Sequence, residues 1–265
     1  MQLPTLLPLK TEGESFAGFS YHLDGGLVPA LTVNLNGQSS IYFEHHTLLW
    51  KSTSIQIGIK KLDGVFNRMI SGMPIFMTEA VGTGPIAMSR DGVGQIFPLH
   101  LKRGQEIDIR EHQFLAATNS VDYSFQMVRG IANILFGGTG FFIDKFRALS
   151  DDGIVWLYGY GNVFEVNLAA GEQIDVEPSA WLYKDPTVQM DTNLTNLSTG
   201  LFGGNSFTLN RFTGPGKLGI QSMSMPNILA ANVASGVTSS NSSSNTEAAG
   251  VIGLASAAFK LFGKD

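Results

Sequence analysis

An internal repeat of about 67 residues constrains the fold of this chain more than any other feature. The segment GQEIDI at 104–109 recurs as GEQIDV at 171–176, which is an offset of 67 positions (171 − 104). An earlier copy begins at Gly37-Gln38, again 67 positions ahead of Gly104-Gln105. The chain is therefore interpreted as three diverged copies of one unit, with boundaries near 21–87, 88–150 and 151–220.

The hydrophobic pattern within each copy is that of β-strands. Leu31, Val33 and Leu35 alternate with polar residues before a turn at Asn36-Gly37, as expected of a half-buried strand. The continuous apolar run at 154–157 predicts a strand that is covered on both faces. With 31 glycines and only 15% charged residues, the composition suits short strands joined by tight turns. We predict an all-β fold over residues 1–226, with three β-sandwich units in a pseudo-threefold ring.

The charge and the cysteine count exclude several classes of function. A formal net charge of −5 argues against nucleic-acid binding, which requires a clustered basic surface. The adjacent basic pairs Lys60-Lys61 and Lys102-Arg103 are interpreted as solvated turn residues. There is no cysteine, so disulfides and thiol chemistry are excluded. No leader-like N-terminus and no apolar run of transmembrane length is found, which predicts a cytoplasmic protein that could also lie peripherally on a membrane.

The C-terminal part of the chain has a different composition. Residues 227–245 are rich in Ser and Asn and predict a flexible linker. Residues 246–265 predict a short amphipathic helix, too short in its uncharged part to span a bilayer. Its apolar stripe is the candidate contact for a partner or a membrane and consists of Val251, Leu254, Ala255, Ala258 and Phe262. The helix is expected to dock on the β-domain, on another subunit or on lipid.

No residue pattern in the chain predicts a catalytic, metal or cofactor site. Histidine and glutamate cluster at 44–46 and at 111–112, but no His-x-His spacing occurs, and adjacent strand residues face opposite ways. The third copy has Pro178-Ser179 at the equivalent place, which excludes a symmetric three-copy metal site. The glycine-rich stretches 82–85, 137–140 and 214–216 lack the Lys-Ser/Thr of a phosphate loop and are interpreted as tight turns.

The Gly-Gln/Glu turn before Ile-Asp-Ile/Val, the Phe/Trp-Leu that follows, and the repeated Phe-Gly-Gly-x-x-Phe segments resemble a known family. It contains the mitochondrial protein named for altered inheritance of mitochondria, number 24, and many bacterial relatives. The resemblance covers about residues 15–222. It implies β-sandwich units in a pseudo-threefold ring, similar to the tryptophan RNA-binding attenuation protein, and it supplies no catalytic residues.

These observations favour a non-enzymatic assembly or scaffold protein that has a protein partner or associates with itself. A membrane surface is a further candidate for its location. The alternative that stays open is a small-ligand- or metal-binding β-protein, including an enzyme.

Overall fold

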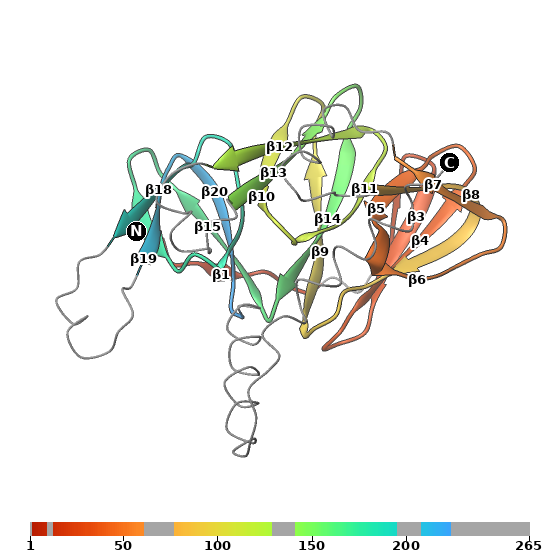
Figure 1. Cartoon of the computed structure of the whole chain (residues 1–265), viewed down its shortest axis with the longest axis horizontal. Coiled ribbons are helices and arrows are strands. Elements are labelled where there is room, and N and C mark those ends of the chain that lie inside the picture. Colours follow the sequence, from red (N-terminus) through yellow and green to blue (C-terminus); the bar gives the residue numbers. More distant parts are fainter. Residues whose placement is uncertain (1, 10–12, 61–76, 129–140, 195–207, 224–265) are drawn as a thin grey trace, which may run out of the picture. The chain divides into compact units, whose positions relative to one another are not determined.

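A computed structural model describes residues 2–9, 13–60, 77–128, 141–194 and 208–223 of the chain. The described residues all lie in one compact unit, Met1–Met225. The predicted linker, the predicted C-terminal helix and its apolar stripe all lie outside the described residues. Within the described residues the protein is built of β-strands with a single short 3-10 helix (Figure 1), which confirms the predicted all-β class.

The first β-unit contains most of the N-terminal strands. Its last strand, β8, is long: its first half pairs with β5 and β7, and its second half pairs with β4 and β6. The short strand β2 (Glu14–Phe16) extends this unit by pairing with β3. The other elements are β3 (Phe19–Asp24), β4 (Ala30–Asn36), β5 (Ile41–Glu44), the 3-10 helix η1 (His45–Thr47), β6 (Leu48–Lys51), β7 (Ile55–Ile59) and β8 (Met77–Met88).

The second β-unit uses two strands where the first uses β8. Strand β13 pairs with β10 and β12, and β14 pairs with β9 and β11. The six strands are β9 (Gly94–Leu101), β10 (Glu106–Arg110), β11 (Phe114–Thr118), β12 (Val121–Val128), β13 (Phe141–Ala148) and β14 (Gly153–Tyr160).

The third β-unit repeats this arrangement. Strand β19 pairs with β16 and β18, and β20 pairs with β15 and β17. The N-terminal strand β1 (Thr5–Leu6) adds to the outer edge of β15. The six strands are β15 (Val163–Leu168), β16 (Gln173–Val176), β17 (Trp181–Lys184), β18 (Gln189–Leu194), β19 (Thr208–Thr213) and β20 (Gly216–Gln221).

Two local features recur at the repeat spacing. Gly37, Gly104 and Gly171 have φ of 86°, 84° and 75°, so each occupies the left-handed turn conformation that glycine adopts without steric cost. The register of β6, β11 and β17 against its neighbour shifts once, at Leu48/Trp50, Phe114/Ala116 and Trp181/Tyr183 respectively. These positions define which residues of the three β-units correspond.

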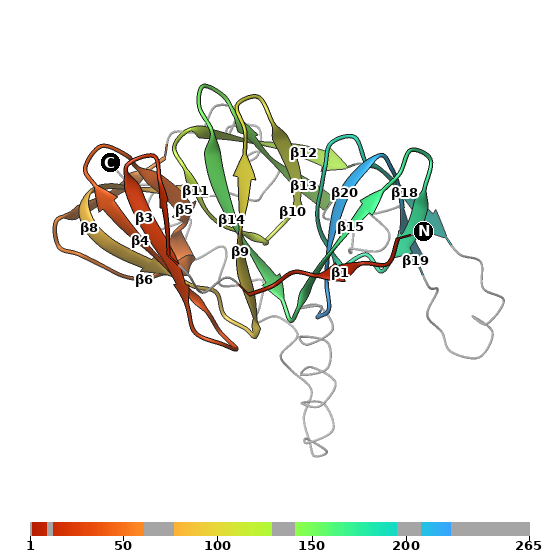
Figure 2. The ribbon, with the colours of Figure 1, turned by 180° about the vertical axis from the view of Figure 1, so that it is seen from behind.

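The β-units join through strands, and the same six-strand order arises twice. One order is β9-β14-β11-β5-β8-β7, in which β11 of the second unit pairs with β5 of the first. The other is β15-β20-β17-β10-β13-β12, in which β17 of the third unit pairs with β10 of the second. Strands β18, β19 and β16 form a separate sheet. Strands β6 and β19 lie at opposite ends of the described β-structure in both views (Figures 1 and 2).

The apolar core follows these sheets. All eight residues of β14 are buried, which confirms the strand predicted from the run at 154–157. Trp156 is fully buried and meets the ring of Tyr21 edge to face, with 5.1 Å between the centroids. A second buried cluster surrounds Phe114, whose ring stacks on Phe146 at 4.6 Å.

Two local predictions are wrong. The stretch 82–85 is part of the continuous strand β8, although a tight turn was expected. Gly82 (φ 133°) and Gly84 (φ 119°) let the strand change sheets without a loop, and a Cβ on Gly82 would lie 2.5 Å from the carbonyl oxygen of Ser54. His45 and His46 are in η1, whereas strand geometry was assumed for them. Of the tight turn predicted at 214–216, Gly214 and Pro215 lie between β19 and β20, and Gly216 begins β20. The stretch 137–140 lies outside the described residues.

Candidate functional site: inter-unit interfaces and edge strands

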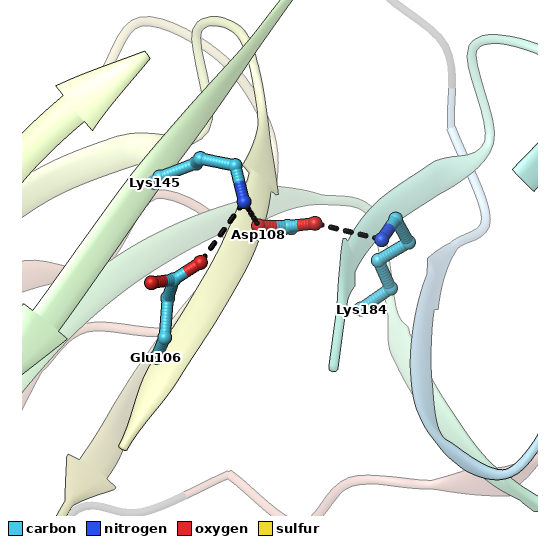
Figure 3. Close-up of polar contacts among 4 residues, drawn as sticks. All are labelled: Glu106, Asp108, Lys145 and Lys184. Carbon is cyan, nitrogen blue, oxygen red and sulfur yellow. Dashed lines mark hydrogen bonds and ion pairs between the residues drawn. The ribbon is translucent and has the colours of Figure 1, made fainter. Parts of the chain in front are cut away.

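The interface between the second and third β-units contains a buried ion pair. Strands β10 and β17 pair at Asp108↔Lys184 and Ile109↔Tyr183. The Lys184 Nζ donates to Asp108 Oδ2 at 2.7 Å, and both side chains are only 6% exposed. We call this the polar interface (Figure 3). Because a charge removed from water is costly unless it is compensated, each of the two groups depends on the other.

A second lysine completes the network around Asp108. The Lys145 Nζ donates to Asp108 Oδ1 at 2.8 Å and to Glu106 Oε1 at 2.9 Å (Figure 3). Burial disfavours the charged ammonium of Lys145, but the hydrogen bonds that it donates to Asp108 and Glu106, together with their charges, outweigh burial and raise the pKa of Lys145. Both oxygens of Asp108 therefore accept from an ammonium group, one on each side.

The interface between the first and second β-units is apolar at the corresponding place. Strands β5 and β11 pair at Phe43↔Ala116, Tyr42↔Ala117 and Ile41↔Thr118. The buried Tyr42 donates its hydroxyl to the Val121 carbonyl at 3.0 Å. Burial raises the pKa of Tyr42 well above its usual value, so the phenol stays neutral. We call this the apolar interface.

A buried arginine borders the apolar interface. Arg90 forms an ion pair with Glu44, which ends β5, and both side chains are at most 10% exposed. The Arg90 Nη2 also donates to the Phe114 carbonyl at 2.6 Å, at the start of β11. The arginine therefore ties the two strands together across the interface.

The strands that correspond to these interfaces in the two outer units are free at one edge. Among the described strands, β6 pairs with β8 alone and β16 pairs with β19 alone. Leu49 and Trp50 of β6 are 56% and 50% exposed. Their counterparts in β11 and β17 include Leu115 and Leu182, which are fully buried. An unpaired strand edge with exposed apolar side chains is a template for pairing with another chain.

A cavity lies beside the polar interface. Its volume is about 530 Å³, and Tyr183, Glu165 and Lys217 line it together with residues of β9 and β10. The Tyr183 hydroxyl donates to Glu165 at 2.5 Å, and the Lys217 ammonium lies 3.2 Å from the same carboxylate. Burial raises the pKa of Tyr183, with the Glu165 charge adding to the effect. The polar groups of the cavity thus neutralise one another.

The histidines considered in the sequence do not form a metal centre among the described residues. The His46 Nε2 lies 3.3 Å from Glu44, whose carboxylate is already paired with Arg90. Burial lowers the pKa of His46 despite the nearby Glu44. His112 lies in a turn with φ of 68°.

The polar interface was not predicted from the sequence. Asp108 alternates with Ile107 and Ile109, a pattern typical of a half-buried strand with its polar residue in solvent, yet Asp108 is buried. Two signals could have identified it. Aspartate recurs at Asp175, and a lysine ends the apolar run Trp-Leu-Tyr-Lys at Lys184. The predicted partner-contact residues Val251, Leu254, Ala255, Ala258 and Phe262 lie outside the described residues.

The fold and its interfaces define a class of protein: an all-β chain whose β-units join edge to edge. A family model described as Mitochondrial biogenesis AIM24 matches residues 21–223. The chain belongs to this family, as the sequence resemblance predicted. The crystal structure of protein SPYM3_0169 from Streptococcus pyogenes has a similar fold, with a TM-score of 0.65 and 21% identity over 82% of this chain and 99% of that one. No curated protein matches the chain.

In the described part of the chain, no helix is long and apolar enough to cross a membrane.

Proposed function

We propose that this chain is a non-enzymatic assembly protein that binds other protein chains, including copies of itself, through the edges of its sheets. The observation that carries the proposal is the exposure of β6. Leu49 and Trp50 are about half exposed on a strand whose counterparts β11 and β17 are buried in inter-unit interfaces. Because each side chain is already about half buried, covering the rest of both contributes roughly 1.5–3 kcal/mol in total to association.

The three β-units are proposed to be diverged copies of one ancestral unit with pseudo-threefold character. Three strand-pairing schemes, three left-handed glycines and three register shifts at the repeat spacing support this. A protein that already joins copies of one unit along its own chain is well suited to joining further units from another chain.

The test of assembly is the mass of the full-length protein in solution. Native mass spectrometry and sedimentation velocity over a wide concentration range should show species at multiples of 28.5 kDa. Trp50→Ser should shift the distribution toward the single chain, while Leu149→Ser, which alters another exposed apolar residue, should not. A single-chain mass at every concentration would contradict the proposal.

We place the protein in the cytoplasm, with a membrane surface as a second binding partner for the C-terminal stripe. The support is the amphipathic pattern of residues 246–265. Leu254→Glu should reduce co-sedimentation of the full-length chain with phosphatidylcholine–phosphatidylglycerol vesicles, whereas Ser256→Glu on the opposite face should have less effect. Equal loss in both variants, or no co-sedimentation of the unaltered chain, would remove the membrane from the proposal.

A further inference from the structure

The six-strand arrangement occurs twice in the chain as a complete set of paired strands. The strands equivalent to a third set are also present, but they form two separate groups of three. The groups are β4-β8-β6 in the first β-unit and β16-β19-β18 in the third. Strands β11 and β17 are equivalent to β6, and strands β5 and β10 are equivalent to β16. In the two complete sheets these equivalents pair with each other, β11 with β5 and β17 with β10. Two of the three equivalent interfaces are therefore formed within the chain, and among the described strands one edge of each kind has no partner strand.

The free edges are also chemically matched, and the polar interface supplies the register. Lys51 follows the register shift of β6 as Lys184 follows that of β17. Asp175 lies opposite the basic Arg211 of β19, just as Asp108 lies opposite Lys145 of β13. The residues that form the buried ion pair between β10 and β17 thus have counterparts of the same charge on β16 and β6.

Both counterparts are accessible for such a contact. Asp175 already accepts from Arg211 Nε and Nη2 at 2.7 Å, as Asp108 accepts from Lys145, and its side chain is 31% exposed. Hydrogen bonding to Arg211 lowers the pKa of Asp175, so the carboxylate is charged at neutral pH. The Lys51 ammonium donates to backbone carbonyls of Ser52 and Ile55 at the surface.

We propose that β16 of one copy of this protein pairs antiparallel with β6 of a second copy, with Asp175 opposite Lys51 in the register of Asp108↔Lys184. The interface completes the third six-stranded sheet and covers Leu49 and Trp50. It rests on the proposed assembly function and names the surface through which copies associate. The two edges differ, so the contact is head to tail, and repetition produces a closed ring of copies or an open fibre.

Charge reversal tests the proposed register in the full-length protein. Asp175→Lys and Lys51→Glu should each weaken self-association at least about tenfold, because like charges then face each other across the interface. An equimolar mixture of the two variants should associate again. In the mixture, Asp175 of the Lys51→Glu copy faces Lys51 of the Asp175→Lys copy. At the next interface the introduced lysine at position 175 faces the introduced glutamate at position 51, so opposite charges meet at both interfaces.

Folding controls accompany these variants because Asp175→Lys also opposes Arg211. At concentrations where all are single chains, Lys51→Glu should unfold thermally at the temperature of the unaltered chain, whereas Asp175→Lys should remain folded with a lower Tm. Lys51→Glu provides the cleaner single variant, because within the described residues the Lys51 ammonium bonds to backbone carbonyls and to no side chain. The matched control is Lys102→Glu, which reverses an exposed lysine of a turn outside both edges and should leave association unchanged.

A cysteine pair distinguishes contact between copies from closure of one chain on itself. The chain has no cysteine, so Lys51→Cys with Asp175→Cys supplies the only thiols. Oxidation should give a ladder of cross-linked multiples; a cross-linked single chain would overturn the proposal in favour of closure. If the unaltered protein associates while neither charge reversal matters, this interface is wrong and the assembly function stands. If the unaltered protein never associates, both are wrong.

Discussion

The two inter-unit interfaces of this chain use equivalent strands and opposite chemistry. At the apolar interface Tyr42 faces Ala117, whereas at the polar interface Asp108 faces Lys184. The apolar version is held by packed side chains, where apolar residues of similar volume can replace one another at small cost. The polar version leaves a buried charge uncompensated in any other register, so it specifies one alignment at a cost in desolvation. An edge that must find its partner in solution benefits from the second kind.

The largest expected difference follows from removing one member of the buried ion pair. Asp108→Ala should lower the free energy of unfolding by about 3–5 kcal/mol, because Lys184 then remains charged and buried. Urea denaturation followed by fluorescence measures it. Replacing both members, as Asp108→Leu with Lys184→Met, should recover most of the loss. A double variant as unstable as Asp108→Ala would show that the ion pair contributes net stability to the fold, and does not merely fix the register of β10 against β17.

A smaller effect is expected at the apolar interface. Tyr42→Phe removes the donor to the Val121 carbonyl and leaves that acceptor buried, which should cost about 1–2 kcal/mol in the same denaturation measurement. Near-ultraviolet circular dichroism should show unchanged packing. A loss as large as that of Asp108→Ala would mean that the two interfaces depend equally on polar contacts, contrary to the comparison.

The smallest effect is the dependence of the polar interface on alkaline pH. The pKa of Lys145 is raised in the folded state, so its contribution is fully present below the unfolded value of about 10.4 and is lost as the pH rises through the folded value. The difference in unfolding free energy between the unaltered chain and Lys145→Met should therefore shrink between neutral pH and strongly alkaline pH. A difference that is constant with pH would show that the ammonium charge contributes nothing.

The sequence predicted the parts of the fold that depend on local periodicity. The strand at 154–157 and the turns at Gly37, Gly104 and Gly171 follow from alternation and from glycine at the repeat spacing. The continuous strand through 82–85 could not be predicted, because glycine next to proline is typical of a turn unless a neighbouring strand approaches closely. The strand geometry assumed for His45 and His46 was wrong because the 3-10 helix η1 has only three residues, which are too few to show a helical period in the sequence.

The candidate interfaces were harder to predict than the strands. Asp108 is buried because a strand 76 residues later supplies a lysine, and no pattern within the strand itself contains that information. Repeat alignment does contain part of it, since the offset of 67 places Asp175 with Asp108. The match of Lys51 with Lys184 requires the register shifts of β6 and β17, which are visible only in the structure. The exposure of Leu49 and Trp50 could be recognised only by comparison with their buried counterparts, which requires the pairing of strands in three dimensions.

Strand β8 has a consequence for how the first β-unit opens. It runs through Met77–Met88 without a loop and bonds four strands, whereas the other β-units divide this task between β13 and β14 or β19 and β20. Two strands separated by a loop can fray independently, but two halves of one strand share a backbone that carries each disturbance across Gly82 and Gly84. We therefore expect the backbone amides by which β4, β5, β6 and β7 pair with β8 to exchange their hydrogens with solvent together, as one cooperative unit.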